Sequence, residues 1–335
     1  MRKDIYEINY ENKLDVYQTQ KAIKFVKDNF EKELAKKLDL LRVSAPLFVS
    51  SSSGLNDGLS GIEKPISFKI NSSDDNVEIV HSLAKWKRMA LSKYDIYTYK
   101  GIYTDMNAIR KDEEPDFIHS VYVDQWDWEK AILESDRTFS YLKRTVKRIY
   151  SAIYKIANEV EKKYPFLKNE LPKEITFIST KELERRLPYL SRKEREDEIT
   201  RAYGAVFIYQ IGEKLSDGLP HDSRAADYDD WKLNGDILVY YSLYDMGLEL
   251  SSMGIRVNKD RLQKQLKAKG ELDKLSNSYC KSIMNDELPQ SIGGGIGQSR
   301  LCMFLLKKAH IGEVQVSSWD KKEVEKLKEH NIFLL

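Results

Sequence analysis

The feature that most constrains the fold of this chain is a glycine-rich stretch, Ser-Ile-Gly-Gly-Gly-Ile-Gly-Gln-Ser-Arg, at residues 291–300. Four glycines in five positions leave the backbone open to a ligand, and Arg300 adds a permanent cation. Leu301, Phe304 and Leu305 follow at helical spacing, so we expect a strand that leads directly into a helix N-terminus. The stretch predicts a site for a flat or anionic ligand; the alternative is a glycine-rich turn with a surface arginine.

The nucleotide-binding fingerprints of other folds do not match this stretch. A dinucleotide-binding turn would need glycine at 293, 295 and 298, but position 298 is Gln. The phosphate-loop pattern Gly-x-x-x-x-Gly-Lys-Ser/Thr occurs nowhere in the chain. If the stretch binds a nucleotide, the fold is therefore neither a Rossmann fold nor a P-loop fold.

The charge balance and the cysteine content limit the class of protein. Lys and Arg number 55 and Asp and Glu 53, so the net charge of +2 gives no electrostatic reason to expect a nucleic acid or a membrane as partner. Cys280 and Cys302 are far apart in sequence, which argues against a disulfide framework or a thiolate metal site. No apolar run approaches the about 18 residues of a membrane span. We therefore expect a soluble, cytoplasmic protein.

Hydrophobic periodicity and capping signals predict strands and helices in one domain that spans residues 1–335. The connections between strands are mostly too short for parallel crossovers, so we expect an α+β fold with a mostly antiparallel sheet flanked by helices. Pro46 cannot donate a backbone hydrogen bond and is expected at a sheet edge or an interface. The expected strands are 40–49, 66–70, 101–110, 120–129, 203–211, 233–241 and 248–257, and the expected helices are 17–38, 128–164, 180–187, 192–203, 259–285 and 321–330.

Polar residues also occur where packing would not require them. In the strand expected at 120–129, Gln125 and Asp127 share one face with valines, so we expect this face to line a polar site. The segment 81–88 places three cations within four residues, and the loop 214–231 holds five aspartates, an arginine and a histidine. Loops of that length and charge are usually either mobile or functional.

Three blocks of the sequence resemble the signature motifs of the class II aminoacyl-tRNA synthetases. The helix and strand around Pro46 resemble the dimer-forming first motif, Arg110 with the strand 120–129 resembles the second, and residues 293–300 resemble the third. Three runs are more specifically similar to the ammonia-dependent asparagine synthetases, which are aspartate–ammonia ligases. These runs are VHSLAKWKR at 80–88, SVYVDQWDWE at 120–129 and ELSSMGIR at 249–256, and the resemblance covers nearly the full chain.

The resemblance implies a class II synthetase-like core and an enzyme that makes L-asparagine from L-aspartate, ATP and ammonia. The β-carboxylate of aspartate would attack the α-phosphorus of ATP, and pyrophosphate would leave. Ammonia would then displace AMP from the β-aspartyl adenylate. A carboxylate that attacks a polyanion needs fixed cations and Mg²⁺ to offset charge repulsion. The first-motif resemblance also implies a homodimer.

The same resemblance assigns residues to ATP and to the metal. Arg110 is expected to hold the α-phosphate, and Arg300 to stack on the adenine. Glu249 is the expected Mg²⁺ ligand and Asp236 a second candidate, because hard oxygen ligands suit this ion. A structural ion pair is the alternative for each of these charged residues. The floor below the adenosine is expected to consist of Gly293, Gly294, Gly295 and Gly297.

Other residues are expected to contact aspartate or ammonia. Lys87 and Arg256 resemble carboxylate-binding residues of the aspartyl synthetases and would hold the carboxylate that is not activated. Asp57 or Asp127 is a hypothesis for the base that takes a proton from ammonium. The further candidates for substrate contacts are Ser82, Gln125, Arg224, Asp229, Ser251 and Ser252. The cations expected to be solvated or salt-bridged are Lys85 and Arg88, and the acids expected to be surface charges as readily as site residues are Asp222, Asp227 and Asp230.

Two other functions are compatible with parts of the sequence. A truncated aspartyl- or asparaginyl-tRNA synthetase would share the core, but it would need an anticodon-binding domain of about 100 residues. The first core helix is expected here from residue 17, which leaves no room for one. A paralogue that kept the fold as a binding module would be expected to have lost Arg110, Glu249 or Arg300, and all three are present.

Overall fold

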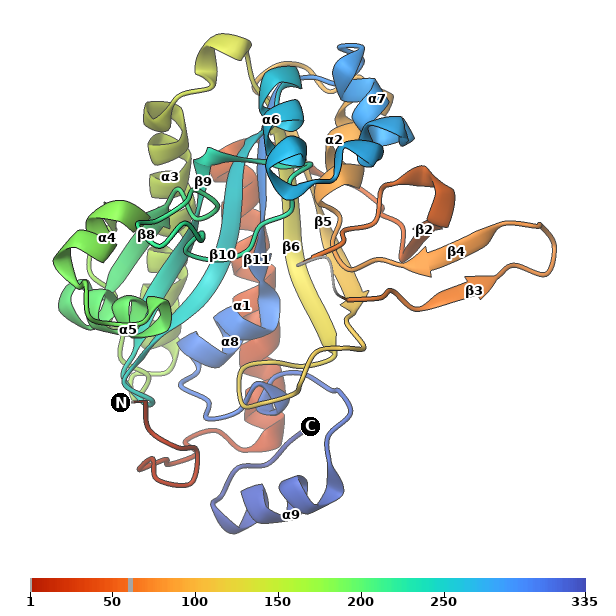
Figure 1. The fold of residues 1–335 in the computed structure, drawn as a ribbon. Helices are drawn as coiled ribbons and strands as arrows, with labels where there is room; N and C mark the ends of the chain where they lie inside the picture. The colour runs from red at the N-terminus through yellow and green to blue at the C-terminus, as the bar shows by residue number, and fades with distance from the viewer. Residues whose placement is uncertain (1, 60–62) are drawn as a thin grey trace.

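The computed structural model describes residues 2–59 and 63–335, and a large mixed sheet forms its centre (Figure 1). The sheet has eight strands in the order β1-β5-β6-β11-β10-β9-β8-β7 among the described residues. Only its two outer pairs, β1 with β5 and β7 with β8, are parallel. The α+β class with a mostly antiparallel sheet is thus confirmed. The strands are β1 (Leu40–Arg42), β5 (Gly101–Ile109), β6 (Tyr122–Ala131), β7 (Thr176–Ser179), β8 (Ala205–Tyr209), β9 (Asp229–Tyr241), β10 (Met246–Arg256) and β11 (Ser291–Gly297).

The glycine-rich stretch forms β11, which lies in the middle of the sheet between β6 and β10. Its last residue, Gly297, is followed at once by the helix α8 (Gln298–Leu305). The predicted strand that leads into a helix is therefore confirmed. In the antiparallel register, Gly293, Gly295 and Gly297 lie opposite Glu129, Asp127 and Gln125 of β6, so these residues share one face.

A small second sheet of three strands projects beside β5 (Figure 1). It contains β2 (Phe48–Ser50), β4 (Asn76–Ile79) and β3 (Ser67–Lys69), in that order. The single strand expected at 40–49 is wrong, because the chain leaves β1 at Arg42 and enters β2, in the other sheet, at Phe48. Pro46 lies in the break between the two strands, where its missing N–H breaks no ladder.

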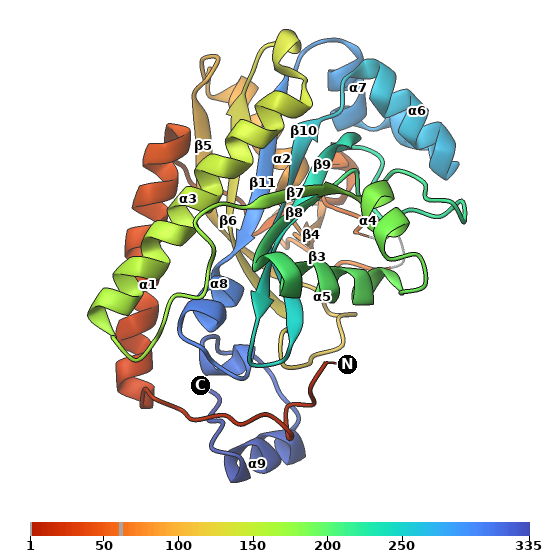
Figure 2. The ribbon, with the colours of Figure 1, turned by 90° about the vertical axis from the view of Figure 1, so that its left-hand side faces the viewer.

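Two long helices, α1 (Val16–Leu38) and α3 (Phe139–Lys163), lie side by side over one face of the large sheet (Figure 2). Trp126 and Trp128 of β6 are fully buried on this side, and the Phe30 ring of α1 lies 4.7 Å from the Trp126 ring. The expected helix start at 128 is wrong, since β6 continues to Ala131 and the Thr138 side chain caps α3 only at residue 139.

The remaining helices lie around the other face and the ends of the sheet (Figures 1 and 2). The expectations for 180–187 and 192–203 are confirmed by α4 and α5, and the expected segment 259–285 contains α6 and α7 with a short 3-10 turn between them. No helix in the described part of the chain is long and apolar enough to cross a membrane. The helices not yet placed are α2 (Ala84–Lys93), α4 (Thr180–Arg186), α5 (Arg192–Tyr203), α6 (Lys259–Lys269), α7 (Ser278–Met284) and α9 (Lys321–Glu329).

Candidate active site

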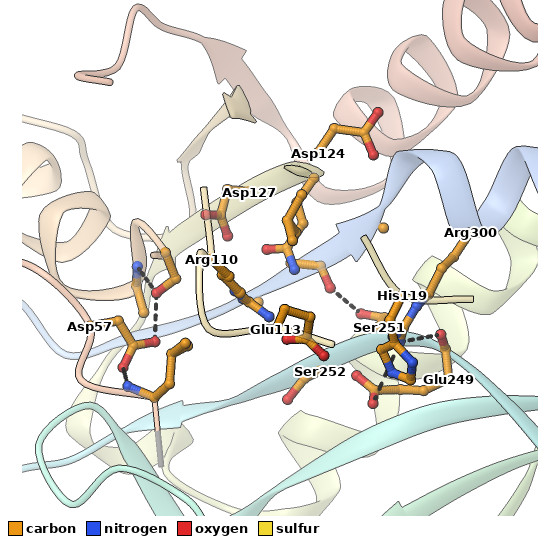
Figure 3. Close-up of a pocket in the computed structure, with 18 of the residues that line it drawn as sticks. Asp57, Arg110, Glu113, His119, Asp124, Asp127, Glu249, Ser251, Ser252 and Arg300 are labelled. Atoms are coloured by element: carbon orange, nitrogen blue, oxygen red, sulfur yellow. Dashed lines mark hydrogen bonds and ion pairs between the residues drawn. The ribbon is translucent and has the colours of Figure 1, made fainter. Parts of the chain in front are cut away.

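A cavity of about 520 Å³ opens on the face of the sheet opposite α1 and α3 (Figure 3). Its wall is built from β6, β10, β11 and the starts of α2 and α8, together with the loop after β2, the loop between β5 and β6 and the loop before β9. This volume is in the usual range for a site that holds a small molecule. Five basic side chains line the cavity: Lys87, Arg110, Arg224, Arg256 and Arg300.

The glycines of β11 leave space for side chains of the neighbouring strand β6. A Cβ at Gly293 would lie 1.9 Å from Oε2 of Glu129, and one at Gly295 would lie 2.3 Å from Oε1 of Gln125. Gly293 does not line the cavity, whereas Gly294, Gly295 and Gly297 do. A Cβ at Gly297 would meet Arg300 Cβ at 3.3 Å, so only a small adjustment would be needed there.

Lys87 of α2 and Asp127 of β6 form a buried ion pair at the base of the cavity. Lys87 Nζ lies 2.5 Å from Asp127 Oδ1 and donates a second hydrogen bond of 2.9 Å to the carbonyl oxygen of Gly294. Burial lowers the pKa of Lys87, and the opposing charge of Asp127 only partly offsets this effect. The pair thus joins α2, β6 and β11 at one point.

Arg256 at the end of β10 is held between two carboxylates. Its Nη2 donates to Oε2 of Glu129 at 2.7 Å, and its Nη1 donates to Oδ1 of Asp229 at 2.5 Å. Ser291 also donates to Glu129, over 2.7 Å. Burial alone would raise the pKa of Glu129, but Arg256 outweighs it and holds this pKa below its usual value. At Asp229 the effect of burial is larger than the opposing effect of Arg256, so the pKa of Asp229 is raised.

Arg110 and Arg300, the two arginines expected to bind the nucleotide, both line the cavity (Figure 3). Arg110 follows β5 and donates its Nη2 to the carbonyl oxygen of His81 at 3.2 Å. Arg300, in the first turn of α8, donates Nη1 to the carbonyl oxygen of Glu249 at 3.2 Å. The Glu249 carboxylate is 3.9 Å from the same Nη1. Backbone carbonyls therefore hold both guanidinium groups at the cavity wall.

Asp57 enters the cavity from the loop that follows β2. Its Oδ2 accepts a 2.7 Å hydrogen bond from the Ser82 hydroxyl, and its Oδ1 accepts one of 2.9 Å from the backbone N–H of Leu59. Asn56 fixes the same loop, since its Oδ1 accepts from the backbone N–H of His81 at 2.9 Å. The carboxylate of Asp57 is therefore held in place on the opposite side of the cavity from Glu249 (Figure 3).

The two expected metal ligands lie in different surroundings. Glu249 lines the cavity and its side chain is 38% exposed. Asp236 of β9 does not line the cavity, and its Oδ2 is hydrogen-bonded to Nη2 of Arg224, which does. Burial raises the pKa of Asp236 to about 8, opposed by Arg224 and assisted by Glu249. Within residues 2–59 and 63–335, no three His, Cys, Asp or Glu side chains are grouped so that they could hold a metal ion.

The structure brings most of the predicted site residues together at the cavity wall. Only Gly293 and Asp236 of the predicted set lie outside it. The predicted residues that line the wall are Asp57, Ser82, Lys87, Arg110, Gln125, Asp127, Arg224, Asp229, Glu249, Ser251, Ser252, Arg256, Gly294, Gly295, Gly297 and Arg300.

The residues expected at the surface are corrected in several cases. Asp227 and Asp230 are buried and pair with cations, Asp227 with Lys85 over 3.1 Å and Asp230 with Arg137 over 2.9 Å. Arg88 is also buried, but it donates to the carbonyl oxygens of Val257 and Pro289 and forms no salt bridge with any described residue. The expected salt bridge of Lys85 is confirmed, whereas its solvated alternative is wrong.

Sequence reasoning missed several residues of the cavity wall. Glu113 and His119 come from the loop between β5 and β6, which folds over the cavity (Figure 3). Asp124 points to the start of α8, where its Oδ1 accepts from the N–H of Ser299 at 3.0 Å. The acidic composition of the β5–β6 loop was a signal that could have suggested Glu113. No comparable signal marked Asp124, whose neighbours on the same face of the strand, Tyr122 and Trp126, are aromatic.

A family model described as aspartate-ammonia ligase matches residues 17–331 of the chain. The aspartate–ammonia ligase of Fusobacterium nucleatum subsp. nucleatum is 57% identical over 326 residues, which cover 97% of this chain and 99% of that protein. The chain belongs to the aspartate–ammonia ligase family. The ligase of Clostridium perfringens strain SM101 is 52% identical over the whole length of both chains. The family resemblance read from the sequence is thereby confirmed.

Solved structures confirm the class II synthetase fold of this ligase. An asparaginyl-tRNA synthetase from Pyrococcus horikoshii, complexed with asparaginyl-adenylate, has a TM-score of 0.65 at 14% identity and matches 90% of this chain and 68% of its own. The corresponding Entamoeba histolytica complex has a TM-score of 0.61 at 14% identity and matches 90% of this chain but only 66% of its own. The ligase chain thus spans about two thirds of the length of these synthetases.

Proposed function

We propose that this chain forms L-asparagine from L-aspartate and ammonia through a β-aspartyl adenylate, and that it releases AMP and pyrophosphate. Family membership supports the ligase activity itself. The adenylate route rests on one structural observation. Arg110 and Arg300, which the class II resemblance assigns to the nucleotide, line the same cavity as the buried Lys87 and Arg256. A nucleotide and an amino acid could therefore lie side by side in this cavity.

In the first step, an oxygen of the aspartate β-carboxylate attacks the α-phosphorus, and the bond to pyrophosphate breaks. Arg110 would hold the α-phosphate and stabilise the negative charge that develops on its oxygens. Arg300 would cover the adenine with its planar guanidinium group. Gly294, Gly295 and Gly297 would lie beneath the nucleotide, where β11 offers a surface of backbone atoms.

Lys87 and Arg256 would recognise the carboxylate of aspartate that does not react. Both side chains already have buried carboxylate partners, so each is held in a fixed orientation before the substrate arrives. The contacts to the α-amino group would come from a set of polar residues around them. We assign to this set Ser82, Gln125, Asp127, Asp229, Ser251 and Ser252.

In the second step, ammonia attacks the carbonyl carbon of the adenylate, and AMP leaves with the oxygen of the broken bond. Ammonium is the dominant form at neutral pH, so a base must take one of its protons. Asp57 fits this role better than Asp127. Among the residues that the structure describes, its carboxylate accepts from neutral donors, the Ser82 hydroxyl and the N–H of Leu59, whereas Asp127 is already paired with Lys87.

Mg²⁺ fits the acidic pair formed by Glu249 and Asp236. Glu249 offers a partly exposed carboxylate at the cavity wall, and Oδ1 of Asp236 is buried without a hydrogen-bond partner in the described part of the chain. Oxygen ligands of this kind suit the ion. When bound, it would neutralise charge on the phosphates of ATP.

The experiment is to incubate the purified protein with ATP, Mg²⁺, aspartate and ammonium, and to measure asparagine, AMP and pyrophosphate. We expect one AMP for each asparagine. Formation of ADP and phosphate would contradict the adenylate route. If AMP formed only after tRNA was added, the chain would act as a synthetase instead.

We also propose that the enzyme is a cytoplasmic homodimer. The first-motif resemblance supports a dimer, and so do exposed apolar residues beside the edge strand β1, where Leu41 is 62% and Leu47 50% exposed. A mass in solution near twice 39.1 kDa is expected from light scattering. A species of 39.1 kDa alone would refute the dimer.

A further inference from the structure

The ion pair between Arg224 and Asp236 is only half formed. Nη2 of Arg224 donates to Oδ2 of Asp236, and Nη1 donates to Oδ2 of Asp222 at 3.2 Å. Nε of Arg224 and Oδ1 of Asp236 are both buried, and neither has a hydrogen bond of good geometry among the described residues, although the Ser252 side chain favours the charged form of Asp236 and so lowers its pKa. A parallel, two-bond arrangement of the kind that arginine and aspartate often adopt would have satisfied both atoms.

The two unpaired atoms require opposite partners. Nε of Arg224 is a cationic donor and needs an anionic or polar acceptor, whereas Oδ1 of Asp236 is an acceptor and can bind a cation. Buried polar atoms in native proteins rarely remain without a partner unless a ligand, a water molecule or an ion supplies it. A divalent cation bound to a phosphate oxygen would satisfy both atoms at once.

Arg224 lies between the cavity and Asp236. Arg224 lines the cavity, while its partner Asp236 is 6% exposed and does not. Glu249 lines the cavity nearby, and its charge acts on Asp236. A cation that enters from the cavity can therefore reach Glu249 directly, whereas at Asp236 it would compete with Arg224 for the carboxylate.

The backbone that follows Arg224 is fixed by side chains of other elements. The carbonyl oxygen of Ala225 accepts from Trp231 Nε1 at 3.1 Å, and that of Ala226 accepts from Gln265 Nε2 at 3.0 Å. Asp227 is in its buried pair with Lys85. Rotation of the Arg224 side chain, rather than movement of the whole loop, is therefore the simplest way to free both oxygens of Asp236.

We propose that Arg224 is a placeholder cation that occupies Asp236 before the metal–nucleotide complex binds. In the complex, Asp236 would hold the divalent cation, and the guanidinium group of Arg224 would contact a phosphate oxygen instead. The Asp236 carboxylate would then have a cation beside it in both states. This inference rests on the proposed function for the identity of the nucleotide, ATP. The sequence had suggested that Arg224 contacts aspartate. This inference instead gives Arg224 a role in the binding of the metal and the phosphates.

The test is a titration of the chelator-treated full-length protein with Mn²⁺, a spectroscopic substitute for Mg²⁺, without nucleotide. Electron paramagnetic resonance measures the free ion. Arg224→Gln removes the competing charge, so we expect Mn²⁺ to bind roughly tenfold more tightly, which corresponds to about 1.4 kcal/mol. In calorimetry with Mg²⁺ and a non-hydrolysable ATP analogue, the same variant should bind the nucleotide roughly tenfold more weakly, and aspartate as the wild type does.

Three comparisons decide the outcome. Arg192→Gln removes a cation that holds the outer side of the same loop through Asp217, and it should leave both affinities within about twofold of the wild type. Arg224→Lys keeps the charge and should keep the wild-type affinity for Mn²⁺. If Arg224→Gln does not fold, which thermal unfolding would reveal, Arg224→Met provides a second neutral side chain of similar length.

Opposite shifts in the two affinities distinguish this role from a structural one. A merely structural arginine would weaken both Mn²⁺ and nucleotide binding, and an aspartate-binding arginine would weaken aspartate binding alone. Either result, or an unchanged affinity for Mn²⁺ in the neutral variants, would overturn the proposal. Asparagine formation by the wild type is measured separately, so a failure of the proposed function remains distinguishable from a failure of the placeholder.

Discussion

Lys87 Nζ lies 2.5 Å from Asp127 Oδ1, and both side chains are almost completely buried beneath the cavity. Removal of one partner would leave an uncompensated buried charge. We therefore expect Lys87→Met to lower the free energy of unfolding by about 3–5 kcal/mol and to abolish asparagine formation. Urea unfolding measures the first effect. Lys93→Met, at the exposed end of the same helix, should change stability by less than about 0.5 kcal/mol.

Two glycines of β11 should differ sharply in their tolerance of a methyl group. At Gly293 the new Cβ would lie 1.9 Å from Glu129 Oε2, which Arg256 and Ser291 hold in place. Gly293→Ala is expected to cost about 3 kcal/mol or more, since both overpacking and a disturbed buried ion pair contribute.

Gly297→Ala is the matched control, because its Cβ would meet Arg300 Cβ at 3.3 Å. We expect a loss of less than about 1.5 kcal/mol in the same urea titration. Equal losses for the two variants would contradict the steric argument.

The pH dependence of stability should reveal the ion pair of Glu129. Arg256 holds the pKa of Glu129 below the value of 4.5 that applies to an unfolded chain. The unfolded state therefore binds the proton more readily, and the stability from this pair is complete above pH 4.5 and is lost as the pH falls through the lower, folded pKa. Glu129→Gln should be less stable at pH 7 by about 3 kcal/mol and should lose less further stability on acidification than the wild type.

Arg300→Ala should weaken ATP binding and leave aspartate binding intact. Arg300 lines the cavity next to β11, where we place the adenine, and a charged hydrogen bond or stacking contact is worth about 1.5–3 kcal/mol. Calorimetry should therefore show an ATP dissociation constant raised roughly tenfold to hundredfold. Lys307→Ala removes a cation near the end of the same helix, where it pairs with Glu170 over 2.9 Å, and should bind ATP normally. A larger effect on aspartate than on ATP would reverse the assignment.

Asp57→Asn tests the base in the second step. An amide cannot accept the proton of ammonium, so we expect adenylate formation, followed as exchange of pyrophosphate into ATP, to continue at the wild-type rate. The ammonia-dependent rate should fall at least roughly a hundredfold. Full ammonia-dependent turnover by this variant would exclude Asp57 as the base.

The local features of the fold could be predicted because they depend on neighbouring residues. The glycines, followed by Leu301, Phe304 and Leu305 at helical spacing, were enough to predict β11 and α8. The period of two along β6 separated the site face, with Gln125 and Asp127, from the core face. The start of α3 was predicted too early, because β6 extends into residues whose pattern also fits a helix.

The long-range pairs could not be predicted. Asp227 and Asp230 fall in the stretch that was expected to be a polar loop, and nothing near them in sequence shows that they will be buried. Their partners Lys85 and Arg137 lie 142 and 93 residues away in sequence. The same reason explains why Glu129 was not assigned to Arg256, which is 127 residues further along the chain. The partner of such a charged residue can be identified only in the folded structure, where strands that are distant in sequence lie side by side.

The central position of β11 has a consequence for how the protein is made. It is the last strand of the large sheet in the sequence, yet it joins β1, β5 and β6 on one side to β10, β9, β8 and β7 on the other. A ribosome releases the N-terminal strands first, at about 5–20 residues per second. Until residue 297 has emerged, the nascent chain carries two half-sheets with open edges and no complete cavity. We therefore expect chaperones to engage this chain late in translation, and shortened chains to aggregate before they can bind substrate.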